Sequence, residues 1–164
     1  MNDLAPPMML RWLLASVHLL GLGIGLSAVW VRGRALKGPL DRSALQRAFL
    51  ADSVWGLAAL LWISTGLWRL LGGTEKPTTY YVHNHIFMAK MALLLLILVL
   101  EAWPMTTLIR WRMQVGRGEL PDTRVAPRLA RISFLQAGIV VLMVFAATAM
   151  ARGLNVAAIV ASRR

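Results

Sequence analysis

The stretch from Tyr80 to Glu101, YYVHNHIFMAKMALLLLILVLE, decides the fold of this 164-residue chain. It opens with two tyrosines, two histidines and an asparagine and then becomes apolar, interrupted only by Lys90 and Glu101. A helix needs about twenty mainly apolar residues to cross a bilayer, and residues 86–109 supply that length. The stretch therefore predicts a transmembrane helix. Its ionisable residues are candidates for a functional site, because charge inside such a helix is costly.

Helical spacing divides the polar residues of this stretch between two faces. At about 100° per residue, steps of seven and of eleven residues both return almost to the starting direction. His83, Lys90 and Glu101 therefore share one face, whereas His85 points well away from it. Asn84 lies between the two histidines and is a further polar candidate.

Three more segments have the length and composition of membrane spans. The chain is 58% hydrophobic and its mean hydropathy is +0.62, which is too apolar for a soluble helical domain of this size. No cysteine is present, which excludes disulfides and thiolate chemistry. We predict an all-α, antiparallel four-helix transmembrane bundle in the lipid bilayer, a single domain over 1–164. The expected helices cover about 8–31, 43–71, 80–112 and 129–151, and an extension of the last one to 162 is the alternative end.

The basic residues that give the net charge of +11 are distributed along the chain as in a membrane protein. Basic residues gather in 32–47 and 110–131 and are sparse between 69 and 76. By the positive-inside rule, the first and third connections lie in the cytoplasm and both termini lie on the other side of the membrane. Topology and anionic lipid account for this charge, so no nucleic-acid partner is expected.

The first expected helix combines a histidine with closely spaced glycines. His18, Gly21, Gly25 and Ala28 are three, four and three residues apart, which places them on one helix face. A Gly-x-x-x-Gly pattern lets either a neighbouring backbone or a flat ligand approach closely. Both interpretations are open from the sequence.

Two histidines are predicted at similar depth in the membrane. His18 follows the interfacial Trp12 by six residues, and His85 follows Tyr81 by four. Two imidazoles at one depth on separate helices could ligate the iron of haem b between the first and third helices. Alternatively, His18 forms a hydrogen bond across the bundle, while His83 and His85 lie at the wet interface.

The charged residues have similarly open roles. Lys90 either extends its amine to the headgroups or pairs with a carboxylate, including a propionate of a bound tetrapyrrole. Asp52 and Glu101 fall in the cytoplasmic half, where they would face each other or basic loop residues. At the opposite side, Arg69, Lys76 and Arg152 would neutralise propionates or bind lipid phosphate.

Several segments carry a family resemblance: His18 with GLGIGL, ADSVWGLAALLWISTGLWR at 51–69, and EKPTTYYVHNHIFMAKMALLLLILVLEAWPM at 75–105. They resemble a bacterial integral-membrane family catalogued as domain of unknown function 2214, which implies the bacterial inner membrane. Combined with the positive-inside rule, this places both termini in the periplasm. More distantly, the layout is similar to HemJ-type protoporphyrinogen oxidases and CopD-type copper-resistance proteins. The HemJ resemblance implies a haem ligand at His18 and an essential lysine at Lys90. The spacing of His85 from Lys90 departs from that pattern, five residues instead of two.

These observations lead to three hypotheses on function. The first is a haem-b protein for electron transfer or porphyrinogen oxidation, with His18 and His85 as axial ligands and Lys90 on a propionate. The second is a non-enzymatic subunit of a larger membrane complex or homo-oligomer. The third is an ion or proton pathway that uses Asp52, Lys90 and Glu101.

Overall fold

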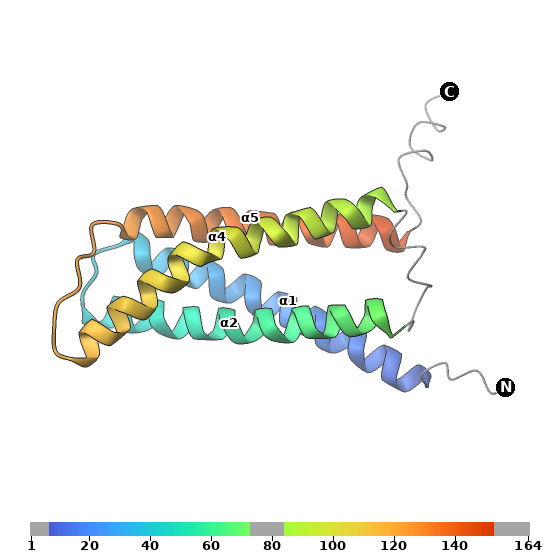
Figure 1. Cartoon of the computed structure of the whole chain (residues 1–164), viewed down its shortest axis with the longest axis horizontal. Helices are drawn as coiled ribbons and strands as arrows, with labels where there is room; N and C mark the ends of the chain where they lie inside the picture. The colour runs from blue at the N-terminus through green and yellow to red at the C-terminus, as the bar shows by residue number, and fades with distance from the viewer. Residues whose placement is uncertain (1–6, 73–83, 153–164) are drawn as a thin grey trace, which may run out of the picture.

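The computed structural model describes residues 7–72 and 84–152, and it folds them into four helices (Figure 1). They are α1 (Met8–Lys37), α2 (Arg42–Leu71), α4 (His85–Gly116) and α5 (Ala126–Ala151). Each is long and apolar enough to cross a membrane. The predicted all-α transmembrane bundle is therefore confirmed.

Helix bounds differ from the sequence prediction mainly at the connections. α1 continues from the expected end at 31 to Lys37, because no glycine–proline break occurs before Gly38 and Pro39. The structure also extends α4 to Gly116 and begins α5 at Ala126, three residues early. At both connections the helices extend beyond their apolar spans. The expected start of the third helix at 80 and the extension of the last to 162 lie outside the described residues.

Two helices begin at side-chain caps. The Asp41 carboxylate accepts the Ala44 N–H at 2.6 Å and so caps α2. The Asn84 side-chain oxygen accepts the N–H groups of Ile86 and Phe87 at 2.9 and 3.2 Å and caps α4. Both caps satisfy amide groups that the first turn of a helix leaves without partners.

The bundle has two distinct ends, seen at the left and right of Figure 1. We call the end with the connections at 38–41 and 117–125 the loop end, and the end at Pro7, Gly72, Asn84 and Arg152 the terminus end. α1 packs along both α2 and α5, and α4 packs on α5 with only a few contacts to α2. α4 crosses the bundle obliquely, from the α5 side at the terminus end toward the start of α2 at the loop end.

Burial along α4 is uneven. Its buried residues are Ile97, close to the middle of the helix, and Pro104, Leu108 and Trp111 in the half toward the loop end. Between His85 and Leu96 no residue of α4 is fully buried. The bundle is therefore closely packed toward the loop end and more open toward the terminus end.

Candidate functional site

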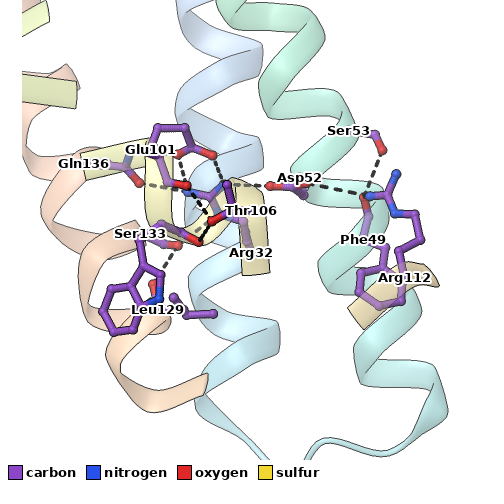
Figure 2. Close-up of polar contacts among 12 residues, drawn as sticks. Arg32, Phe49, Asp52, Ser53, Glu101, Thr106, Arg112, Leu129, Ser133 and Gln136 are labelled. Carbon is purple, nitrogen blue, oxygen red and sulfur yellow. Dashed lines mark hydrogen bonds and ion pairs between the residues drawn. The ribbon is translucent and has the colours of Figure 1, made fainter. Parts of the chain in front are cut away.

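The most elaborate polar site is a cluster around Arg32, whose side chain is fully buried in the loop half of the bundle (Figure 2). Its Nε donates to Ser133 Oγ at 3.0 Å. Its Nη1 donates to Asp52 Oδ1 at 2.8 Å and to Glu101 Oε1 at 2.6 Å. Its Nη2 donates to Glu101 Oε2 and Gln136 Oε1, both at 2.8 Å. A guanidinium has five N–H donors, so each one is used.

The acceptors of this cluster are fixed in turn. Gln136 Nε2 donates to Glu101 Oε2 at 2.8 Å and to the Ile97 carbonyl at 3.3 Å. Ser133 Oγ donates to the Leu129 carbonyl at 3.0 Å. Such a network holds the arginine in one orientation, since Gln136 and Ser133, two of its acceptors, are themselves held by further hydrogen bonds.

Arg112 adds a second cation at the edge of the cluster. Its Nη2 lies 3.7 Å from Asp52 Oδ2, and its side chain is 45% exposed. The same atom donates to the Phe49 carbonyl at 2.8 Å, and the guanidinium lies over the Phe49 ring. Two arginines thus balance the two carboxylates of Asp52 and Glu101, which reduces the cost of burying charge in a membrane protein.

All four described helices contribute to this site, which we call the Arg32 cluster: Arg32, Asp52, Glu101, Arg112, Ser133 and Gln136. Asp52 and Glu101 were predicted to face each other or basic loop residues, and the structure brings both to one arginine. The sequence prediction ends the first helix at Val31 and leaves Arg32 in the connection, which is wrong, because α1 continues to Lys37. The absence of a helix breaker before Gly38 was the signal that could have placed it correctly.

A second polar site lies in the terminus half. Two hollows of about 170 and 430 Å³ share the lining residues His18, Trp62, Arg69, Lys90, Met143 and Met150. We call them together the cavity. The remaining walls are largely apolar. Ile63 and Leu94 line the smaller hollow, and Leu22 and Val144 line the larger one. The sequence singles out His18, Lys90 and Arg69 as candidates, and the structure brings all three to the cavity.

The ring of His18 is held by α2. Its Nε2 accepts the indole N–H of Trp62 at 3.2 Å. Its Nδ1 lies 3.1 Å from Thr65 Oγ1, which donates its own proton to the Leu61 carbonyl at 2.7 Å. The directions of these hydrogen bonds indicate a neutral His18 imidazole whose proton is on Nδ1. His18 therefore forms the cross-bundle hydrogen bonds that were one of the two predicted roles.

The glycine face of α1 packs against α2. A Cβ built on Gly21 would lie 3.4 Å from the Trp62 Cβ, and one on Gly25 would lie 3.2 Å from the Trp55 ring. Both glycines are buried. The Gly-x-x-x-Gly pattern allowed either a neighbouring helix or a flat ligand on this face, and in the structure the neighbouring helix α2 occupies it.

Other predicted site residues lie apart from the cavity. His85 is exposed in the first turn of α4 and does not line either hollow. Asn84 acts as the cap of α4, and Arg152 is exposed at the end of α5, where its N–H donates to the Thr148 carbonyl. His83 lies outside the described residues. Within 7–72 and 84–152, no three His, Asp or Glu side chains gather as a metal site.

An apolar layer separates the cavity from the Arg32 cluster. On α1, His18 and Arg32 are fourteen residues apart, or about 21 Å along the axis. Between these levels lie buried apolar residues: Ala28, Val29, Trp55, Ile97, Ala137, Ile139 and Val140. Trp62 and Met143 belong to the same buried cluster and also line the cavity. The two polar sites are therefore separate in this structure.

Four apolar helices around a buried charge network define a multi-pass membrane protein with a helical bundle. A sequence model of the family described as "Predicted membrane protein (DUF2214)" matches residues 10–155. The chain belongs to this family, as its resemblance predicted. No curated protein and no solved structure matches the chain.

Proposed function

We propose that the protein binds an amphipathic, anionic ligand in the cavity of the terminus half. The observation that carries this proposal is the position of Lys90 and Arg69 at a hollow whose other walls are mostly apolar. A carboxylate or phosphate would find charge-assisted hydrogen-bond donors there, while an apolar body would contact Trp62, Leu94 and Met143. The larger hollow, about 430 Å³, falls in the range of roughly 300–1,000 Å³ usual for ligand pockets.

Haem b is the ligand that we would test first, and the residues of the cavity fit it in part. His18 would ligate iron through Nε2, exchanging its contact with Trp62, while Thr65 keeps the ring oriented through Nδ1. Lys90 and Arg69 would hold the propionates. Bound haem would supply the redox chemistry, whereas the protein supplies ligation, burial and charge.

The predicted second ligand does not fit this arrangement. His85 is exposed and lies off the cavity wall. Met143 and Met150 line both hollows, and a His/Met pair is an established axial set for haem iron. We therefore propose His18 with a methionine in place of the bis-histidine pair.

An absorption spectrum tests this proposal. Protein expressed with haem supply and purified in mild detergent should carry a Soret band, because the cavity retains the haem. His18→Ala should reduce the haem content at least about tenfold, since an axial ligand is lost. His85→Ala is the matched control and should leave the spectrum unchanged. A wild type without a Soret band rejects haem b, and loss of the band in His85→Ala alone rejects the assignment of His18.

The broader proposal has its own test. Lipids and small molecules retained by colourless protein would be extracted and identified by mass spectrometry, for wild type and for a Lys90→Met, Arg69→Gln variant. An anionic amphiphile that is present in the wild type and depleted in the variant supports the cavity as its site. Equal retention by both proteins rejects it.

We further propose that the loop end faces the cytoplasm of a bacterial inner membrane, with both termini on the periplasmic side. The support is the excess of arginine and lysine near the connections at the loop end. Since the chain has no cysteine, Gly38→Cys and Arg152→Cys can be labelled singly with a membrane-impermeant maleimide. Labelling from the periplasm should modify only Arg152→Cys; the reverse pattern contradicts the proposed orientation.

The other two hypotheses receive less support from the geometry. An ion or proton pathway through Asp52, Lys90 and Glu101 would have to cross the apolar layer described above. Unchanged proton flux in liposomes on Lys90→Met would remove it. A subunit role predicts co-purification with a larger complex at fixed stoichiometry, without a bound cofactor.

A further inference from the structure

The outer surface of α1 and α2 carries a long apolar groove that is separate from the cavity. The two helices pack against each other, and the groove between them measures about 890 Å³. On α1 it extends from Ser16 to Val31, which is fifteen residues or about 22 Å. One leaflet of the hydrocarbon core is about 15 Å thick, so the groove is long enough for an acyl chain.

The floor of the groove is made of small residues and its rims of large apolar ones. A Cβ on Gly23 would meet nothing within 4 Å. The hydroxyl of Ser27 donates to the Gly23 carbonyl of its own helix and so adds no free donor to the floor. Leu20 and Leu50 line the groove and are 63% and 66% exposed. Such a surface fits a flexible hydrocarbon chain.

Two arginines flank the groove toward the loop end. Arg47 on α2 lines the groove itself and is exposed. Arg34 is also exposed, and it follows Val31 by three residues, which places it one turn further along the same face of α1. Each helix thus contributes one cation at the same end of an apolar groove, which complements an anionic headgroup attached to an acyl chain.

These charges disfavour a second copy of the chain in the same groove. Two copies inserted in the same direction would pair this face through a twofold axis along the membrane normal. Arg34 and Arg47 of both copies would then meet at equal depth, where like charges repel. The phosphate of an anionic phospholipid instead attracts both arginines.

We propose that the α1–α2 groove is a binding site for an anionic phospholipid of the leaflet at the loop end. One acyl chain lies along Ser16 to Val31, and the phosphate contacts Arg34 and Arg47. Basic residues close to a bilayer contribute appreciably to the binding of anionic lipid, and basic pockets between helices can select its headgroup. The site does not depend on the ligand proposed for the cavity.

Native mass spectrometry of the delipidated full chain, titrated with phosphatidylglycerol or phosphatidylcholine, tests this site. The first phosphatidylglycerol should bind more tightly than phosphatidylcholine. Arg34→Gln with Arg47→Gln should weaken that first step about twentyfold, because two headgroup contacts are lost. The matched control is Arg128→Gln with Arg131→Gln, which removes the same charge from exposed positions of α5 near the same end and should retain the preference.

A second pair of variants tests the apolar part of the site. Gly23→Leu fills open space in the groove and should weaken binding of phosphatidylglycerol without unfolding the chain. Gly138→Leu on α5 also enters open space and should bind as the wild type does. Circular dichroism would confirm that each variant keeps its helices.

Three results would overturn the proposal. Equal binding of both lipids would mean that no headgroup is selected. Equal weakening by both arginine pairs would mean that only overall charge matters. A dimer of the wild type that Gly23→Leu dissociates would identify the groove as an interface between copies.

Discussion

In the loop half of the bundle Arg32 meets side chains from each of the other three helices, whereas in the terminus half Arg69 and Lys90 border a hollow. Both halves place cations inside a bundle of membrane helices. In the loop half the packing closes around the charge, and the five N–H donors of Arg32 all have acceptors. In the terminus half α4 has no fully buried residue before Ile97, and space remains beside the cations. This difference in packing agrees with a structural role for the first site and with the ligand site that we propose for the second.

The largest expected effect is on stability, from Arg32→Met. Removal of the arginine leaves Asp52 and Glu101 partly buried without their shared partner, and breaking a buried ion pair in this way costs about 3–5 kcal/mol. The unfolding free energy in mixed micelles, titrated with a denaturing detergent, measures the loss.

Two control variants sharpen this measurement. Arg34→Met removes an exposed arginine two residues along the same helix and should change stability by no more than about 0.5 kcal/mol. Arg32→Met combined with Asp52→Asn and Glu101→Gln should recover much of the loss, because no charge is then left unpaired. Equal stability of Arg32→Met and wild type would contradict the role of the cluster.

A smaller effect on stability is expected from Lys90→Met. The lysine is only partly buried, so its removal should cost no more than about 1 kcal/mol. Retention of the cavity ligand, measured after purification, should fall in the same variant. A loss of stability as large as that of Arg32→Met would show that Lys90 stabilises the bundle as much as Arg32 does. It would contradict the proposed difference between the two halves.

The smallest effect concerns the Asp41 cap at the loop end. Its carboxylate accepts the Ala44 N–H and the Ser43 hydroxyl, and these bonds lower its pKa from the ordinary value of 3.8. Because the folded-state pKa is the lower one, the stabilisation is complete above the ordinary value. It is lost as the pH falls through the folded-state pKa. Asp41→Ala should therefore be less stable than wild type at neutral pH, and the gap should shrink in acid.

Asp41→Asn separates the cap from its titration. Asparagine is also a good N-cap, so this variant should keep most of the neutral-pH stability but lose the contribution of Asp41 to the acid dependence. Unfolding curves recorded from neutral pH downward for the three proteins make the comparison. An identical acid dependence in wild type and Asp41→Asn would refute the lowered pKa.

Much of the fold was predictable, because hydrophobic length is a local property of the chain. The run from Ile86 onward marks a membrane span by itself, and Gly38 with Pro39 marks a connection. Helical spacing also placed Gly21 and Gly25 on one face correctly. The partner of that face was not predictable, since a tryptophan side chain and a flat cofactor can fill the same space.

The Arg32 cluster shows where prediction from the sequence ended. Asp52 and Glu101 were recognised as costly groups in need of a partner, but Arg32 had been assigned to a loop. The role of Gln136 as both donor and acceptor in the cluster was not foreseen either. His85 was placed at the depth of His18, yet depth does not fix the rotation of a helix about its axis, and the side chain is exposed.

The sequence by itself determined four membrane-spanning helices, their order and the end at which basic residues gather, because each of these depends on residues close together in the chain. Only the tertiary structure decided that one arginine meets two carboxylates and that a histidine, a lysine and an arginine border one cavity. These contacts depend on how four helices rotate and cross relative to one another, which helix packing determines. The contacting residues are up to about a hundred positions apart in the chain.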